Sequence, residues 1–319
     1  MASDPLDNGF AEAVAIVADV DASTARLCAA TGFARRGPGG AVPAGALALL
    51  GLDEGTGGRE VLLGHPDSAR GAIRLIQLDG PTAPRLRDGA QAWDSGGIFD
   101  INLRALPSIE ALHARFAAQG FLARAPITDW DFGPLAVREV VEDDADGLAI
   151  ALMERVRPPL AGYEGLRGPA SWVFNSTQVV ADFDLARRFY TKTLGWQVVQ
   201  ETEGMAAQPG GRNCMGLPLG LAADLPMRIG IYHPAGRMEG SVEIIAFGCP
   251  TLDFADRAPP LRGWAALRFP VRDLAAVLRR LDGQRVIGPV AFDCAPHGRV
   301  QAAAVVTPWG ARLEFLQAG

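Results

Sequence analysis

The sequence predicts an α+β fold built from repeated strand–helix units. A β-branched run ending at Val179 and Val180 leads into an amphipathic helix that Asp182 or Asp184 caps and Gly195 closes. A segment near the start of the chain repeats this pattern, and apolar strands joined by hairpin turns follow both copies. Such self-similarity indicates several copies of one supersecondary unit rather than a single irregular domain.

The repeat is visible when the chain is taken in order. Residues 17–33 open with V-A-D and end with T-G-F, as residues 180–196 open with V-A-D and end with L-G-W. The apolar strands of residues 63–77 are matched by those of residues 231–246, each pair containing a His-Pro step before its turn. The two halves of the chain therefore begin with equivalent units.

Each half also contains a second unit of the same kind. A strand followed by a helix is expected at residues 99–119 and again at residues 264–281. Apolar closing strands follow at residues 146–153 and 308–315. Residues 158–171, rich in Pro and Gly and without periodicity, separate the two halves as a linker.

The stretch V-A-D followed by R-R-F-Y-T-K-T-L-G-W resembles the opening of a vicinal oxygen chelate module, the βαβββ building block of glyoxalase I, extradiol dioxygenases and the bleomycin- and fosfomycin-resistance proteins. The ending P-W-G-A-R-L-E-F is similar to the D-P-x-G-x-x-x-E-F ending of that superfamily. The resemblance implies four βαβββ modules that form two half-open β-barrel domains with flanking helices. Residues 1–157 would form a domain with a degenerate site, and residues 172–319 a domain with the active cavity. Each half would complete its own barrel from adjacent modules, so that one cavity is built between Trp172 and Gly319 of a single chain.

Composition narrows the class of partner. A net charge of -6 without a cluster of basic and aromatic residues argues against nucleic acid, and no apolar run is long enough to span a bilayer. The N-terminus lacks the basic and apolar regions of a secretion signal, and four cysteines without CxxC spacing are expected to be reduced. We therefore expect a cytoplasmic monomer or homodimer that binds a small-molecule substrate.

The superfamily resemblance also implies where a metal would be held, on the first and last strands of paired modules. The first-strand positions of the second half are Asn175 and Ala266, neither of which is the usual imidazole. The last-strand positions are Glu243 and Glu314. We expect no cofactor and no tightly held iron or zinc, and a weakly bound Mg or Mn on the two glutamates is the alternative.

The equivalent positions of the first half are Glu12, Arg74, Ile101 and Ala151. One of these residues is cationic and two are apolar, so this set cannot chelate a cation. The first half is therefore expected to be metal-free, as the degenerate domain of extradiol dioxygenases is.

A carboxylate among apolar strand neighbours is costly to bury unless it is paired or used. Glu314 and Glu243 are accordingly the candidate catalytic bases, against the alternative that each faces solvent. His233 shares a strand-end position with His65, which indicates a structural role, although its imidazole is also a candidate acid or base. Strand alternation then predicts the substrate-binding lining, which comprises Asn175, Thr177, Trp264, Arg268 and Arg312.

These residues predict an amphipathic pocket in which an arginine binds an anionic or enolisable oxygen, unless each arginine pairs with a glutamate across the barrel. The function expected is that of a lyase or isomerase that acts on a small apolar or aromatic oxygen-bearing substrate by glutamate-assisted proton transfer. A non-catalytic binding or resistance protein is the main alternative, and an extradiol-type dioxygenase is disfavoured by the missing imidazoles. The glycine-rich loop of residues 204–220 is expected to cover the cavity mouth.

Overall fold

The computed structural model describes residues 8–131, 133–208 and 211–319, and it contains four successive βαβββ units. The first unit comprises β1 (Glu12–Ile16), α1 (Val20–Thr31), β2 (Ala34–Arg35), β3 (Gly40–Ala41), α2 (Ala44–Leu49), β4 (Gly58–Gly64) and β5 (Ala72–Leu78). The second comprises β6 (Asp100–Ala105), α3 (Ile109–Ala118), β7 (Leu122–Ala123), β8 (Thr128–Asp131), β9 (Ala136–Asp143) and β10 (Ala149–Arg157). The third comprises β11 (Ala170–Val179), α4 (Phe183–Arg188), the π-helical turn η1 (Phe189–Thr193), β12 (Gln197–Met205), α5 (Leu219–Ala222), β13 (Pro226–His233) and β14 (Ser241–Phe247). The fourth comprises β15 (Gly263–Pro270), α6 (Leu274–Arg280), β16 (Arg285–Cys294), β17 (Gly298–Val306) and β18 (Arg312–Ala318). The predicted α+β class and the repeated unit are confirmed.

The main helix of each unit starts at a side chain that the repeat supplies. Asp19, Asp182 and Asp273 each accept a hydrogen bond from a backbone N–H of the first turn, and Ser108 does the same for α3. The aspartate in V-A-D and V-R-D is therefore an N-cap, which satisfies backbone donors that the helix itself leaves free.

The units do not pair as adjacent neighbours, which corrects the expected domain arrangement. One sheet has the strand order β16-β17-β18-β15-β1-β5-β4-β2 and joins the fourth unit to the first. The other has the order β12-β13-β14-β11-β6-β10-β9-β7 and joins the third unit to the second. We call these the outer-unit sheet and the inner-unit sheet. The predicted linker, residues 158–171, therefore connects strands β10 and β11 of one sheet, and the third and fourth units, which make up residues 172–319, lie in different sheets.

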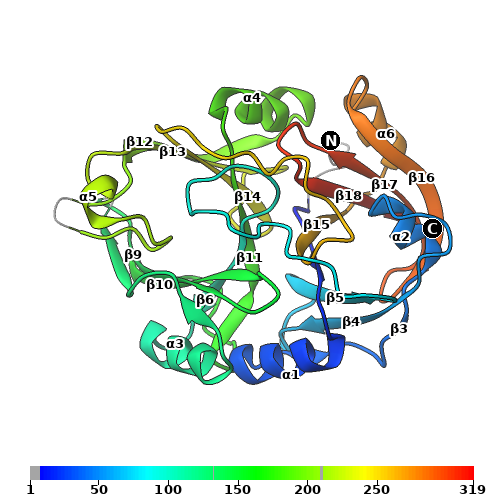
Figure 1. Cartoon of the computed structure of the whole chain (residues 1–319), viewed down its shortest axis with the longest axis horizontal. Helices are drawn as coiled ribbons and strands as arrows, with labels where there is room; N and C mark the ends of the chain where they lie inside the picture. Colours follow the sequence, from blue (N-terminus) through cyan, green and yellow to red (C-terminus); the bar gives the residue numbers. More distant parts are fainter. Residues whose placement is uncertain (1–7, 132, 209–210) are drawn as a thin grey trace.

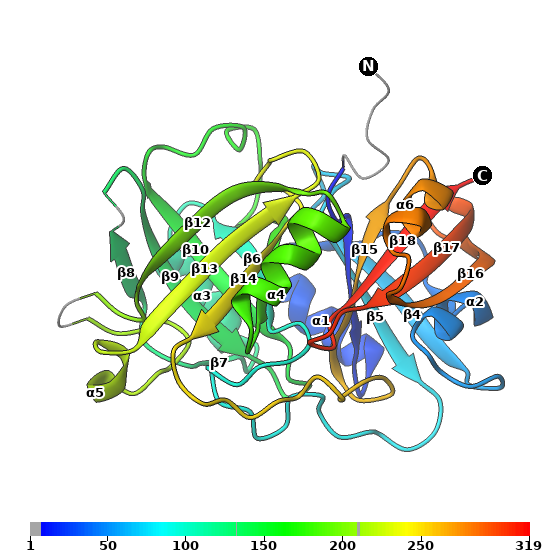
Figure 2. The same ribbon diagram turned by 90° about the horizontal axis from the view of Figure 1, so that it is seen from above.

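Two layers of helices hold the sheets together (Figure 1). α1 and α3 lie side by side, and Arg115 of α3 donates to the carbonyl oxygen of Ala30 at 2.9 Å. Arg280 of α6 donates to the carbonyl oxygen of Leu194, which follows η1, at 2.8 Å. One apolar core between the helices and the sheets contains residues from all four units, including Leu27, Phe116, Phe189, Phe269 and Phe315. Figure 2 shows the two strand layers side by side in the turned view.

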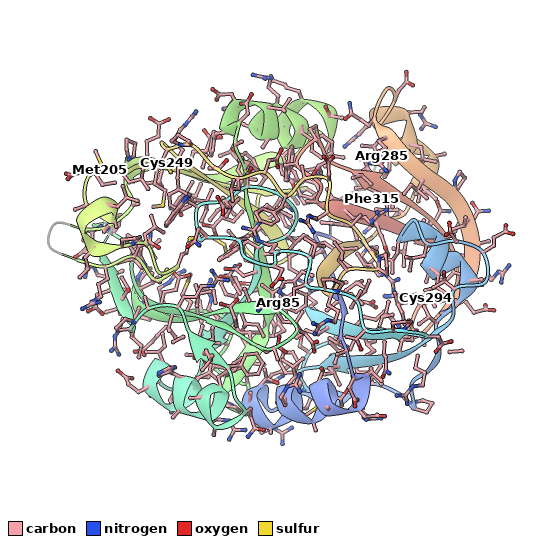
Figure 3. All side chains as sticks on the ribbon, viewed as in Figure 1. Arg85, Met205, Cys249, Arg285, Cys294 and Phe315 are labelled. Atoms are coloured by element: carbon pink, nitrogen blue, oxygen red, sulfur yellow. The ribbon has the colours of Figure 1, made fainter. Side chains whose placement is uncertain are left out.

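Helix α2 covers part of the concave face of the outer-unit sheet. It packs Ala46, Leu47 and Leu50 against Phe292 of β16 and its neighbours. A Cβ atom on Gly45 would lie 2.7 Å from the Phe292 ring, so glycine permits this close approach. Cys294 of β16, labelled in Figure 3, belongs to the same apolar cluster. Within the described residues, no helix has both the length and the apolar character needed to cross a membrane.

Candidate active site

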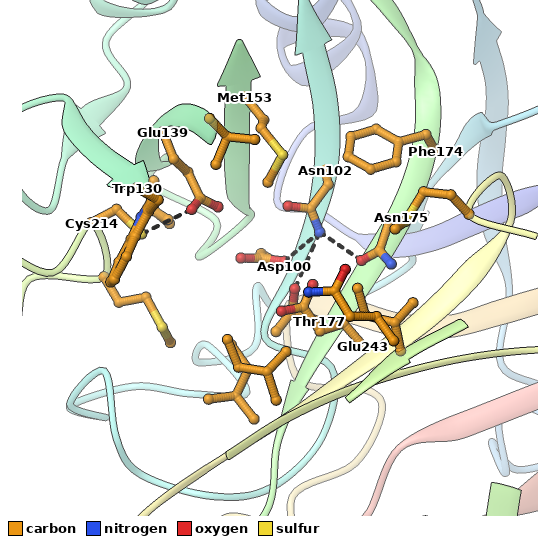
Figure 4. A pocket seen from close by; sticks show the side chains of 18 of the residues that line it. Asp100, Asn102, Trp130, Glu139, Met153, Phe174, Asn175, Thr177, Cys214 and Glu243 are labelled. Atoms are coloured by element: carbon orange, nitrogen blue, oxygen red, sulfur yellow. Dashed lines mark hydrogen bonds between the residues drawn. The ribbon is translucent and has the colours of Figure 1, made fainter. Parts of the chain in front are cut away.

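The concave face of the inner-unit sheet encloses a cavity of about 110 Å³. Its walls come from the second and third units, with apolar side chains from β9, β13 and β14 and four methionines, Met153, Met215, Met227 and Met238. Polar side chains project from the central strands β6 and β11 (Figure 4), so the cavity is apolar at its sides and polar at its floor. Such a lining suits a small molecule with an apolar body and a few oxygens.

Three carboxyl groups meet in this cavity. Asp100 lies on β6, Glu139 on β9 and Glu243 on β14. The strand register brings two of them to one level, because Thr177 of β11 pairs with Asp100 on one side and with Glu243 on the other. Glu139 lies across the cavity beside Trp130 and Cys214, and the Cys214 thiol donates to it at 3.3 Å (Figure 4).

Burial controls the protonation of these three carboxyl groups. It raises the pKa of Asp100 to about 8, with help from the negative charge of Glu139 and against hydrogen bonds from Thr177. Burial, followed by the charges of Glu139 and Asp100, raises the pKa of Glu243 well above its usual range. Burial also raises the pKa of Glu139, although the hydrogen bond from Cys214 acts in the opposite direction. The cavity therefore retains protons on carboxyl groups at neutral pH.

An amide network fixes the floor between these acids. Asn102 Nδ2 donates to Asn175 Oδ1 at 2.9 Å and to Thr177 Oγ1 at 3.1 Å. Asn175 Nδ2 donates in turn to Ser241 Oγ at 2.7 Å. Because these side chains hold one another, the donors and acceptors of the floor are oriented before any ligand binds (Figure 4).

The loop between β12 and β13, which the sequence predicted to cover the cavity mouth, contributes to the cavity lining. Asn213, Cys214 and Met215 line the cavity. Asn213 anchors this turn, because its Nδ2 donates to the carbonyl oxygen of Ala206 at 2.5 Å and its Oδ1 accepts from the backbone N–H of Met215 at 2.8 Å. Residues 209 and 210 of the predicted loop lie outside the described residues.

The structure separates the two glutamates that the sequence placed together. Glu243 faces the cavity, whereas Glu314 lies in the outer-unit sheet, 0% exposed, and accepts from Arg268 Nε at 2.7 Å. Arg268 also lies 3.5 Å from Glu12, which forms a bidentate pair with Arg74 at 2.8 and 3.2 Å. Burial would raise the pKa of Glu12, but Arg74, a hydrogen bond from His297, and Arg268 hold it well below its usual range. The alternative in which an arginine pairs with a glutamate is therefore observed for Arg268, and a metal shared by Glu243 and Glu314 is ruled out by their different sheets.

The remaining predicted residues fall into two groups. Asn175 and Thr177 line the cavity with Glu243, whereas Trp264, Arg312 and His233 do not. Trp264 Nε1 donates to the carbonyl oxygen of Ala149 at 2.8 Å, and Arg312 Nη1 donates to that of Leu49 at 2.7 Å. His233 and His65 have the structural feature in common that the repeat suggested, since Nδ1 of each accepts from the backbone N–H two residues later.

The sequence missed Asp100, Asn102 and Glu139. The expected inward residue of β6 was Ile101, but Ile101 points into the core between sheet and helices, and its two neighbours face the cavity. A shift of one residue moves every side chain of a strand to the opposite face. The signal that could have located them is the alternation of Asp100, Asn102 and Arg104 with apolar residues along β6.

The side chains that line the cavity do not fit the metal site that the superfamily resemblance implies. In the described part of the chain, no three His, Cys, Asp or Glu side chains are arranged to hold a metal ion. The central-strand positions carry Asn102 and Asn175, whose amides already bond each other. Amides are weak ligands for transition metals compared with imidazole.

Comparisons with known proteins agree with this architecture. Residues 172–315 match the sequence model of the Glyoxalase/Bleomycin resistance protein/Dioxygenase superfamily. Glyoxalase I from Zea mays has a similar fold, with a TM-score of 0.64 and 14% identity over 97% of this chain and 92% of that one. A putative dioxygenase from Bacillus subtilis is similar at a TM-score of 0.62, with 13% identity over 99% of this chain and 86% of the other. No curated protein matches the sequence. The resemblance expected from the sequence motifs is thereby confirmed for residues 172–315, and the solved structures share the fold of the whole chain.

Proposed function

We propose that this chain, a member of the glyoxalase, bleomycin-resistance and dioxygenase superfamily by its residues 172–315 and by its fold, is an enzyme of lyase or isomerase type. Its reaction is a proton transfer in the inner-unit cavity, with Glu243 as the base and a small apolar or aromatic oxygen-bearing molecule as the substrate. The observation that carries this proposal is the position of Glu243 in a mostly apolar cavity beside two further carboxyl groups, where its pKa is raised.

The raised pKa of Glu243 makes its carboxylate a strong base in those molecules in which it is ionised, and the reaction starts from that fraction. Ionised Glu243 removes a proton from the carbon next to a substrate carbonyl, and the electron pair of that C–H bond moves onto the carbonyl oxygen. Protonated Asp100, with its pKa near 8, donates a hydrogen bond to this developing oxyanion. If the carbon that loses its proton bears a hydroxyl group, an enediol forms; return of the proton to the former carbonyl carbon, with the hydroxyl-bearing carbon becoming the new carbonyl, completes an isomerisation. If the next carbon bears a leaving group, the oxyanion re-forms the carbonyl and that group departs with its bonding electrons, which completes an elimination. Three interacting carboxyl groups titrate together, so the cavity holds a charge and a proton at the same time.

Metal chemistry is not part of this proposal, because the amides on the central strands lack the basicity of the usual imidazoles. We place the protein in the cytoplasm, in accord with the four unpaired cysteines.

Deuterium uptake tests the proposal. A panel of enolisable carbonyl compounds, including phenylacetone and phenylpyruvate, is incubated with the protein in D₂O, and exchange at the carbon next to the carbonyl is followed by proton NMR. We expect Glu243→Gln to lower the protein-dependent exchange rate of an active compound by about 100-fold or more, the range of a general base. Arg299→Gln, at an exposed position of β17, is the control and should exchange at the wild-type rate. Exchange by Glu243→Gln at the wild-type rate would refute the assignment.

A binding protein that leaves its ligand unchanged is the second candidate. The four methionines in the cavity wall favour it, because flexible thioether side chains adapt to several ligands. Mass spectrometry of a ligand recovered after long incubation separates the two functions: an unchanged ligand supports binding alone, and a product or a deuterated ligand supports catalysis.

A further inference from the structure

Arg104 on β6 is a buried cation without a salt bridge. Its side chain lines the cavity and the residue is 2% exposed. Nη1 lies 3.1 Å from the sulfur of Met153, and the guanidinium carbon lies 3.5 Å from the centre of the Phe174 ring. Nε has no hydrogen-bond partner among the described residues, and no carboxylate of the described chain forms a salt bridge with Arg104. The other two fully buried arginines, Arg74 and Arg268, are paired with glutamates.

A second arginine reinforces this charge. Arg155 of β10 lines the same cavity, and its Nε also lacks a partner among the described residues. Burial lowers the pKa of Arg155, and the positive charge of Arg104 lowers it further. The charge of Glu239 acts on both arginines in the opposite direction, but its carboxylate accepts from Trp172 Nε1 at 2.9 Å instead of pairing with either. Arg104 and Arg155 thus place two positive charges at one end of the cavity, and no salt bridge within the described chain compensates them. A bound anion would supply the missing negative charge.

The geometry favours a planar anion. A guanidinium stacked on an aromatic ring keeps its in-plane donors free, and a carboxylate matches their fork with two parallel hydrogen bonds. Tyr163, in the loop between β10 and β11, interacts with the Arg104 guanidinium, and its ring stacks on Trp172 at a centroid distance of 4.8 Å. Because Arg104 itself is only 2% exposed, its charge is poorly screened by water, which strengthens its pairing with an anion.

The two ends of the cavity are separated by a definite length. Arg104 follows Asp100 by four residues on β6, which corresponds to roughly 13 Å of strand at about 3.3 Å per residue. Glu243 lies level with Asp100 through Thr177. Met153 and Phe174, which contact Arg104, lie beyond Asn102 as seen from Glu243 in Figure 4.

We propose that Arg104, supported by Arg155, binds a carboxylate of the substrate, so that the substrate is a carboxylic acid whose other end reaches Glu243. The position of the reacting carbon at Glu243 rests on the proposed function, whereas carboxylate binding at Arg104 does not. Arg104 thus takes the role that the sequence had assigned to the arginines of the outer-unit sheet.

Calorimetric titration with benzoate and with benzamide tests the inference, because the two probes have nearly the same shape and differ in charge. Wild type, Arg299→Gln and Glu243→Gln should bind benzoate. Arg104→Gln should lose at least about tenfold in benzoate affinity, as expected for a charge-assisted bidentate pair, and should bind benzamide no more weakly than wild type does. Arg104→Lys should retain part of the affinity, since it keeps the charge and loses the fork. Equal benzoate affinity in wild type and Arg104→Gln, or equal binding of the two probes by wild type, would overturn the inference.

Thermal unfolding separates binding from a structural role. An unpaired buried cation does not stabilise the fold, so Arg104→Gln should melt no lower than wild type, and a large drop in Tm would contradict the account. The two proposals fail separately. If Glu243→Gln exchanges protons at the wild-type rate while benzoate binding depends on Arg104, only the catalytic role of Glu243 is refuted. If Glu243→Gln loses exchange while Arg104→Gln binds benzoate as wild type does, only carboxylate binding at Arg104 is refuted.

Discussion

Replacing Arg268 by methionine should destabilise the protein strongly, because the change leaves Glu314 buried without its partner. The 2.7 Å contact between Arg268 Nε and Glu314 Oε2 joins two side chains that are 2% and 0% exposed. Removal of one member of such a pair costs about 3–5 kcal/mol, since the remaining charge stays in a poorly polarisable interior. Replacing both, in Arg268→Met/Glu314→Leu, should cost far less than the two single changes added together.

Urea unfolding followed by tryptophan fluorescence measures this difference as a double-mutant cycle. The expected coupling energy is at least about 2 kcal/mol, and the exposed pair Arg299–Asp293, whose atoms lie 3.5 Å apart, should give about 0.5 kcal/mol or less as the control. A loss below about 1 kcal/mol in Arg268→Met, or additive single changes, would show that the network is not a closed structural unit.

Three further predictions concern the cavity. Because the pKa of Asp100 is raised from 3.8 to about 8, the folded chain holds a proton that the unfolded chain releases, so the associated stability is present below about pH 4 and is lost as the pH rises towards 8. The difference in Tm between Asp100→Asn and wild type should therefore be more favourable to the variant at pH 9 than at pH 5. Asp129→Asn, at a position where the side chain is 84% exposed, is the control and should show no such trend. A Tm difference for Asp100→Asn that does not change with pH would contradict the burial argument. Glu139→Gln removes a negative charge that raises the pKa of Glu243, so the pH profile of proton exchange should move to lower pH, and a shift to higher pH would count against the three-acid cluster. Asn213→Ala breaks both backbone contacts of the cavity wall and should weaken benzoate binding about three- to tenfold with a small change in Tm, while unchanged affinity would show that the wall does not depend on this anchor.

Local features of the fold were predictable from the sequence because they depend on neighbours in the chain. The aspartates that follow the first strands cap helices in the structure, and Gly32 and Gly195 adopt the positive φ angles that end them. Glu243, Asn175 and Thr177 share the cavity because strand alternation and parallel register are short-range properties.

The pairing of units was not predictable in the same way. Whether β15 pairs with β1 or with β11 depends on contacts between segments far apart in the sequence, and the repeat makes the alternatives alike in local pattern. This pairing of units also decides which of the two glutamates lies in the cavity. It placed Glu314 against Arg268 and Glu12, and it left Glu243 facing a cavity whose other walls come from the second unit.

The measurement that tests the central claim most directly compares Glu243→Gln with Glu314→Gln in the same proton-exchange assay, at about 20 °C and per mole of folded protein by circular dichroism. The two residues occupy equivalent positions on the last strands of their units, and only one of them lines the cavity. We predict that Glu243→Gln loses exchange by about 100-fold or more, whereas the folded fraction of Glu314→Gln exchanges within about twofold of wild type. Loss of exchange in Glu314→Gln, with full exchange in Glu243→Gln, would place the chemistry in the other sheet and contradict the account.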